Sequence, residues 1–189
     1  MIKHELESLS RIGYSAIERS NPAILELVLD AIAEISSALV KHRDIVLSAK
    51  SSVLLLGKIE TIARLAVKRH DRLMLFNTCE TLYKLFDDCA RSYFLAYSSM
   101  RLGFYELISS LGEASIDNGF SDGVHIVLEC WGKIVKKVLS LRKIGKLTEM
   151  DGLDIFLLMA PSIMISKSEK EGKPLMAKKL QIEIKKYFI

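Results

Sequence analysis

Histidine and cysteine are the side chains in this 189-residue sequence whose types are best suited to metal binding or nucleophilic catalysis. The four histidines (His4, His42, His70 and His125) are far apart, and none belongs to an H-E-x-x-H or a Cys/His metal motif. His125 and Cys130 are near each other, but five residues is a poor match to one helix face. We therefore predict no catalytic and no metal site, with His42 and His70 near helix C-termini, where the dipole favours them.

The acidic residues offer two further arrangements, and neither completes a known site. One cluster lies within ten residues but lacks the 12-residue spacing and terminal glutamate of a calcium loop. Asp87 and Asp88 are adjacent, but no Glu-x-x-His element accompanies them. Neither a P-loop nor a G-x-G-x-x-G motif is present, so we predict no cofactor and no enzymatic activity. The first cluster, which we interpret as a solvated turn, comprises Glu113, Asp117, Asn118 and Asp122.

Basic residues form two stretches in the last third of the chain. The first contains six bases and no acid, and the second, from Ala160 onward, contains seven lysines and three glutamates. Such stretches could attract nucleic acid, a membrane surface or an acidic protein. The alternative is that they are solvated helix ends with favourable dipole placement. The six candidate anion-binding residues of the first stretch are Lys133, Lys136, Lys137, Arg142, Lys143 and Lys146.

Aromatic residues cluster between positions 93 and 105, with Arg91 and Arg101 nearby. Bases of a nucleic acid could stack on them. The interpretation that we favour is packing between consecutive helical units, because the cluster falls where two such units meet. The aromatic residues are Tyr93, Phe94, Tyr97, Phe104 and Tyr105.

Composition indicates a helical protein with large buried faces. Apolar residues make up 50% of the chain, the mean hydropathy is +0.23, and only three prolines interrupt it. The most apolar run, Leu153 to Ser166, is shorter than the roughly 20 residues of a spanning helix. The first ten residues lack the apolar core of a signal peptide, and three scattered cysteines favour a reducing compartment. These features predict a cytoplasmic protein.

An internal repeat of about 50 residues is the strongest pattern in the sequence. "LSRIGYSAI", "IETIARLAV" and "ISSLGEASI" align without gaps, at offsets of 50 and then 49 residues. Each has apolar residues on one helical face, interrupted by small residues that let another helix approach closely. The small positions are Gly13 and Ala16, Ala63 and Ala66, and Gly112 and Ser115.

A second helix and a turn repeat in the same register. Val28, Ala31, Ile32 and Ile35 correspond to Thr78, Thr81, Leu82 and Leu85, and then to Val127, Cys130, Trp131 and Ile134. The turns are typical of helix caps: Asn21 precedes Pro22, Asp71 occupies the equivalent place, and Asn118-Gly119 precedes Ser121 and Asp122.

The paired helices resemble tetratricopeptide or HEAT-type repeats. The resemblance rests on the "IG" of "SRIGYSA" and the "LG" of "SSLGEAS", and it covers residues 2 to about 143. The period is longer than the 34 or 40–47 residues of those families. The resemblance implies an interaction scaffold and transfers no catalytic residue.

These patterns predict an all-α fold: a right-handed stack of three antiparallel hairpins with C-terminal capping helices. We expect helices near 2–19, 22–42, 45–69, 72–97, 101–117 and 121–143. A helix at 149–160 should end before Pro161 and cover the third hairpin. The polar "SKSEKEGKP" is expected to form a loop, and a last helix to span 174–187. We divide the chain into a repeat domain (1–166) and a lysine-rich segment (167–189).

Two functions are consistent with this reading. The first is a non-enzymatic scaffold that binds a protein partner along its stacked helices. The second is a binder of nucleic acid or membrane surfaces through the basic C-terminal third. Because a stack leaves an apolar face at its uncapped N-terminal end, a homodimer through that end is also expected. We further predict that Gly13, Ala63 and Gly112 lie at close crossings inside their own hairpins.

Overall fold

The computed structural model describes residues 2–40, 45–91, 98–143 and 153–186, and these form eight helices and no strand. The first four helices are α1 (Ile2–Glu18), α2 (Pro22–Val40), α3 (Ile45–Lys68) and α4 (Arg72–Arg91). They are followed by α5 (Ser98–Asp117), α6 (Ser121–Lys143), α7 (Leu153–Lys170) and α8 (Pro174–Lys185). The predicted all-α hairpin stack is confirmed.

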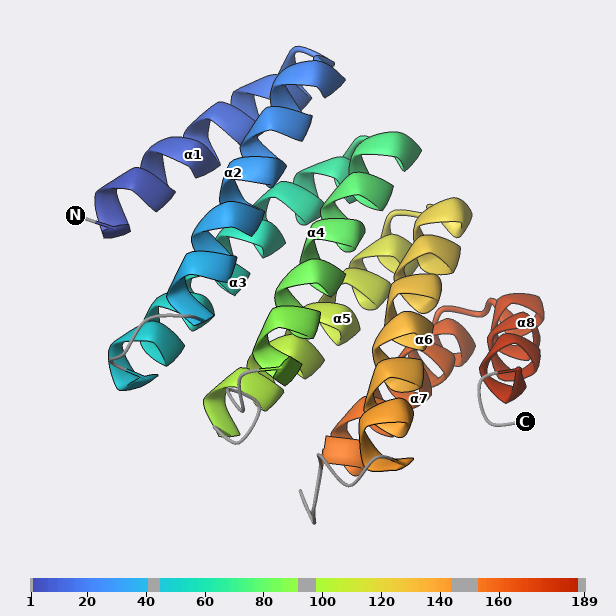
Figure 1. Ribbon diagram of the computed structural model, residues 1–189. Coiled ribbons are helices and arrows are strands. Elements are labelled where there is room, and N and C mark those ends of the chain that lie inside the picture. The colour runs from blue at the N-terminus through green and yellow to red at the C-terminus, as the bar shows by residue number, and fades with distance from the viewer. Residues whose placement is uncertain (1, 41–44, 92–97, 144–152, 187–189) are drawn as a thin grey trace.

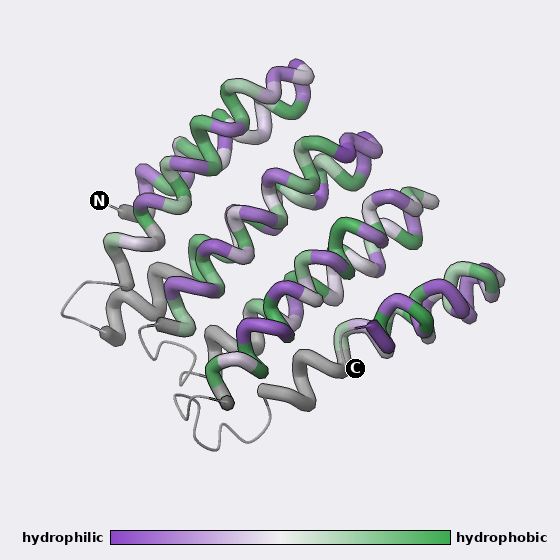
Figure 2. The backbone as a smooth tube through the Cα atoms, turned by 45° about the vertical axis from the view of Figure 1, so that its right-hand side comes forward, coloured by the Kyte–Doolittle hydropathy of each residue, from purple (hydrophilic) through white to green (hydrophobic). Residues whose placement is uncertain are grey.

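The helices form two rows that run in sequence order from one end of the stack to the other (Figure 1). The first helices of the hairpins, α1, α3, α5 and α7, pack side by side in one row. The second helices α2, α4 and α6 form the other row. Along the helices, hydrophilic and hydrophobic segments alternate (Figure 2), as expected where one face is buried and the other meets solvent.

Each hairpin turns by the same backbone motif. In the first turn, the amide of Ser20 donates to the Ile17 carbonyl and that of Asn21 to the Ala16 carbonyl. This is the Schellman pattern, which requires a left-handed residue. The left-handed residues are Ser20 (φ 52°), His70 (φ 55°), Gly119 (φ 67°) and Gly172 (φ 67°). The same pair of hydrogen bonds recurs in the other three turns.

Helix starts follow the predicted caps. The Asn21 Oδ1 accepts a hydrogen bond from the Ile24 amide at 3.2 Å, and the Asp71 Oδ1 accepts one from the Met74 amide at 3.0 Å. These side chains satisfy amides that have no partner inside the helix. The third second-row helix begins at Ser121, as expected.

The six small repeat positions are all buried; Gly13 lies close to α2 of its own hairpin as predicted, whereas for Gly112 the predicted location of the close crossing is wrong. A Cβ atom placed on Gly112 would lie 2.6 Å from Cγ and Sδ of Met164, which is on α7 in the next hairpin. One placed on Gly13 would lie 2.9 Å from Ile62 on α3 and 3.2 Å from Val28 on α2. Both glycines therefore admit a side chain of the following hairpin, because the first helices pack on one another along their row.

The predicted end of the seventh helix is also wrong. α7 continues through Pro161 to Lys170, so the start of the expected loop is helical. A proline inside a helix costs roughly 3 kcal/mol. Packing offsets this cost, because Pro161 and Met164 are buried and α7 lies against α5. The expected domain boundary at 166/167 falls inside this helix.

The capping helices form a fourth hairpin. α7 covers α5, as expected for the helix predicted at 149–160, and it pairs with α8 through a fourth Schellman turn. α5 begins at Ser98, three residues before its predicted start. The predicted ends at 42, 97 and 187, and the predicted start at 149, lie outside the described residues.

The three cysteines are free and buried, as predicted. The Sγ atom of Cys130 lies 3.4 Å from the Cys79 carbonyl. Hydrogen bonding with the Cys79 side chain, and then burial, raise the pKa of Cys130. Burial, with a smaller contribution from Asp88, raises the pKa of Cys89 from 9.0 to about 12. Burial disfavours the charged thiolate relative to the neutral thiol, so the pKa rises.

We expect the thiols to react with an alkylating reagent only when the protein unfolds. At a fixed pH the shift at Cys89 reduces the thiolate fraction roughly a thousandfold, and burial blocks access as well. Mass spectrometry of timed labelling, with and without denaturant, measures the effect. Between pH 9 and 12 the unfolded chain loses a proton that the native thiol keeps, so stability should fall as pH rises there. Rapid labelling of all three cysteines under native conditions would contradict this prediction.

None of the helices in the described ranges is long and apolar enough to cross a membrane.

Candidate docking groove

α8 does not continue the row of second helices. It packs closely on α7 and makes few contacts with α6, whereas α4 packs closely on both α2 and α6. Figure 1 shows α8 set apart from α6 at the C-terminal end of the stack. A groove of about 810 Å³ lies between α6 and α8.

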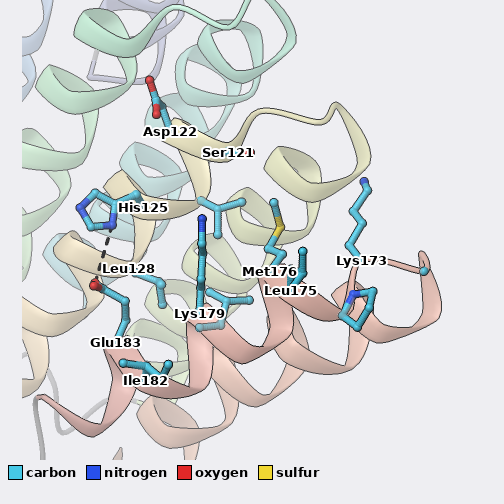
Figure 3. A pocket seen from close by; sticks show the side chains of 14 residues that line it. Ser121, Asp122, His125, Leu128, Lys173, Leu175, Met176, Lys179, Ile182 and Glu183 are labelled. Carbon is cyan, nitrogen blue, oxygen red and sulfur yellow. Dashed lines mark ion pairs between the residues drawn. The ribbon is translucent and has the colours of Figure 1, made fainter.

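The groove is mainly apolar, with charged residues around it (Figure 3). From α6, Val124 and Leu128 line it. α8 supplies most of the remaining apolar wall, and its Leu175 and Ile182 are 78% and 53% exposed. The full lining is Ser121, Asp122, Val124, His125, Leu128, Gly172, Lys173, Pro174, Leu175, Met176, Lys179, Leu180, Ile182 and Glu183.

An ion pair crosses one end of the groove. The Nδ1 atom of His125 lies 3.7 Å from Oε2 of Glu183, and Oε1 of Glu183 lies 2.6 Å from Nζ of Lys186. The hydrogen bond from Lys186 and the charges of Lys186 and His125 lower the pKa of Glu183. The carboxylate therefore stays ionised at neutral pH and links α6 to α8 across the groove.

Two lysines anchor the turn at the other end of the groove. Lys173 donates a hydrogen bond of 2.6 Å to the Ile116 carbonyl, and Nζ of Lys167 lies 2.8 Å from Asp117. The hydrogen bond to Asp117 is the main reason why the pKa of Lys167 is raised. These contacts hold the α7–α8 turn against the end of α5, so the groove is bordered by an anchored turn.

A second hollow of about 420 Å³ adjoins the groove between α4 and α6, and the two share Asp122 and His125. Leu73 and Phe76 line the second hollow and are 55% and 37% exposed. Apolar surface thus extends from α4 over α6 to α8. Arg72 and Asp122, 4.0 Å apart, lie within it.

Two of the six predicted anion-binding residues form ion pairs between neighbouring second helices. Lys133 on α6 contacts Glu80 on α4 and lies 3.9 Å from Glu129. Lys137 lies 2.5 Å from Asp87 on α4. Burial lowers the pKa of Lys133, but its hydrogen bond to Glu80 and the nearby acids outweigh this and raise it. These lysines are already neutralised by acids of the preceding hairpin.

The other four predicted anion-binding residues make no ion pair given above. Lys136 is exposed. The side chains of Arg142 and Lys143, and the whole of Lys146, lie outside the described residues. Of the three lysines of this stretch whose side chains are described, two are therefore paired with acids of α4.

His70, Asp117 and Asp122 make contacts at the hairpin turns, and no group of three His, Cys, Asp or Glu that could hold a metal occurs among the described residues. The His70 ring stacks on Phe120 with 5.0 Å between ring centroids, and its Nε2 lies 2.8 Å from the Asn118 carbonyl. Asp117 and Asp122 form the ion pairs given above. Phe104 packs edge-on against Phe86 of the preceding hairpin, 5.1 Å between centroids, as the packing interpretation predicts. Tyr93, Phe94 and Tyr97 lie outside the described residues.

Sequence reasoning missed the groove residues of α8. The segment beyond 167 is rich in lysine, and its charge concealed the apolar residues between the lysines. The signal was present in Leu175 and Ile182, since seven residues separate positions on nearly the same helix face.

The comparisons with known proteins concern the fold alone. No protein-family model and no curated protein matches the chain. Among solved structures, one titled "DHF91 filament" is similar at a TM-score of 0.77 and 14% identity, covering 100% of this chain and 98% of the other. A second, titled "DHF46 filament", has a TM-score of 0.74 and 13% identity, covering 98% and 96%. At such identities the likeness is one of helical architecture.

Proposed function

We propose that this protein is a non-enzymatic helical-repeat scaffold that binds a partner protein, and that it holds an amphipathic helix of that partner in the groove between α6 and α8. The supporting observation is that α8 leaves the row of second helices. Each earlier second helix packs on its neighbour in that row. The groove therefore lies where a further second helix would pack against α6. The longer-period likeness to tetratricopeptide and HEAT repeats and a cytoplasmic location belong to the same proposal.

The residues that line the groove indicate which kind of helix would be complementary to it. Its apolar wall fits residues at i, i+3, i+4 and i+7 of an amphipathic helix. Lys179 lies in the lining beside the apolar wall, so an acidic residue at the edge of the partner's apolar face would be favoured there. His125 and Glu183 mark the polar end.

We expect Leu175→Glu to weaken binding of such a helix tenfold or more. Burying a leucine contributes about 1.5–3 kcal/mol, and tenfold in affinity corresponds to about 1.4 kcal/mol. Helical peptides with varied apolar and acidic positions are selected by display against the full chain, and the affinity of the selected peptide is measured by fluorescence anisotropy. Leu175 is 78% exposed, so its replacement should leave the fold intact.

Leu139→Glu is the matched control, because Leu139 is 38% exposed on α6 and does not line the groove. It should leave the affinity unchanged. If no peptide is selected, or if Leu139→Glu weakens binding as much as Leu175→Glu, the groove is not the docking site.

The alternative function, binding of anionic surfaces, is less well supported. Lys133 and Lys137 already contact Glu80 and Asp87, so an anionic ligand would compete with these ion pairs. Titration with salt of binding to nucleic acid or anionic vesicles distinguishes the two functions, since phosphate contacts weaken steeply with salt.

A further inference from the structure

The N-terminal end of the stack presents a packing surface that elsewhere in the chain is covered. In the second and fourth hairpins, the residue just before the small position packs against a glycine of the preceding hairpin, as Ile62 does at Gly13 and Met164 at Gly112. Ile62, Leu111 and Met164 are buried. Ile12 occupies the same position in α1 and is 48% exposed.

Other residues of the first hairpin also match residues that contact the preceding hairpin in later copies of the repeat. Arg69 donates a hydrogen bond back to the Ile17 carbonyl of the preceding hairpin, and an arginine, Arg19, occupies the same place in the first turn. On α2, Ile24 is 41% exposed, whereas Met74 at the corresponding position is buried. The first hairpin therefore carries the residues that bury the contact between hairpins elsewhere in the stack, but the described chain has no preceding hairpin to cover them.

The opposite end of the stack does not provide the complementary surface. The small position of α7 is taken by Ile165, a large side chain where the other three copies have glycine or alanine. Glu169 is exposed at the place where Ile17, Val67 and Ile116 are buried. If copies stacked head to tail, α7 would therefore offer neither a small residue to receive Ile12 nor the apolar contact made elsewhere at the position of Glu169.

The end face of α1 is instead complementary to itself. Glu5 and Arg19 are both exposed, and they lie seven residues before and seven residues after Ile12. Residues seven apart share nearly one helix face. Arg19 directly follows the last residue of α1, and its amide still donates to the Ser15 carbonyl, so the three positions follow one side of the helix. Two copies of α1 packed antiparallel about Ile12 would bring Glu5 opposite Arg19 twice. Ser8 and Ser15, which flank Ile12, are small enough to let the helices approach.

We propose that the N-terminal end face binds a second copy of this chain, with the two α1 helices antiparallel about a two-fold axis at Ile12 and Glu5 facing the partner's Arg19. The interface is isologous, so it closes at two copies. It lies at the other end of the stack from the groove, so either proposal can fail while the other holds.

Light scattering coupled to size exclusion tests the assembly at micromolar concentration. The wild-type chain should have twice the monomer mass of 21.3 kDa. Ile12→Asp should give the monomer mass with an unchanged helical circular dichroism spectrum, because Ile12 is half exposed in the monomer. Leu139→Asp is the control, since it changes an exposed leucine of α6 that lies neither on this face nor in the groove, and it should remain a dimer.

Charge reversal tests the geometry. Glu5→Arg alone and Arg19→Glu alone should each be monomeric, because like charges then face each other. An equal mixture of the two variants should recover the dimer mass, because opposite charges then meet at both contacts. The introduced arginine faces the introduced glutamate at one contact, and the native Arg19 faces the native Glu5 at the other. A monomeric wild type, a mixture that stays monomeric, or a mass that grows beyond two copies with concentration would each overturn the proposal.

Discussion

Replacing Trp131 with alanine is expected to lower the free energy of unfolding by about 3–5 kcal/mol, the cost typical of removing a buried aromatic side chain. Trp131 is fully buried in α6 and is among the largest side chains of the core. Domains of this size are stable by about 5–15 kcal/mol, so the variant should be close to unfolding. Urea denaturation followed by circular dichroism at a helical wavelength measures the loss, because the variant lacks the chain's one tryptophan.

Trp131→Leu is the matched control. The equivalent positions of the first and second hairpins hold Ile32 and Leu82, both buried, so leucine is compatible with the backbone at this position. The leucine variant should lose clearly less stability than the alanine variant, because a smaller cavity remains. Equal losses, or a loss below about 1 kcal/mol in the alanine variant, would show that Trp131 does not fill the core as described.

The second large effect is expected at Gly112. Valine there should destabilise the protein by about 1–3 kcal/mol, because its Cβ would overlap Met164 and overpacked cores relax poorly. The same substitution at Gly57 is the control: that glycine also lies within a helix, but nothing is within 4 Å of its missing Cβ. Gly57→Val should change stability by no more than about 0.5 kcal/mol. Thermal or urea unfolding of both variants provides the comparison.

A double-mutant cycle identifies the cause. If the overlap with Met164 is responsible, Gly112→Val combined with Met164→Ala should cost less than the sum of the two single changes. Additive losses would place the strain elsewhere. The result also reports on the contact between α5 and α7, on which the fourth hairpin depends.

Much of the fold could be predicted because local chemistry and periodicity agree. Asn21 and Asp71 were recognisable caps, and both accept the expected hydrogen bond. The fourth hairpin was missed because its first helix contains Pro161, and Ile165 replaces the small residue that marks the other copies. Proline is a local signal, whereas the packing that keeps α7 helical comes from α5.

The groove was beyond sequence reasoning for a different reason. Periodicity shows which face of a helix is apolar, but not how far one helix lies from the next, so the separation of α6 and α8 could not be inferred. The ion pairs of Lys84 with Asp30 and of Lys133 with Glu80 could have been predicted from the sequence. The two lysines are 49 residues apart and the two acids 50, which is the period of the repeat.

The two-row arrangement has a consequence for how the molecule loses its structure. In the described ranges each hairpin contacts mainly the hairpins beside it, and no helix of the first hairpin packs closely on a helix of the fourth. Stability in such arrays is a sum of nearest-neighbour terms, and opening can start at an end without melting the middle. The α1–α2 hairpin has one neighbour and should fray before the interior hairpins. A second molecule bound at that end would supply the missing neighbour and make the whole array unfold more cooperatively.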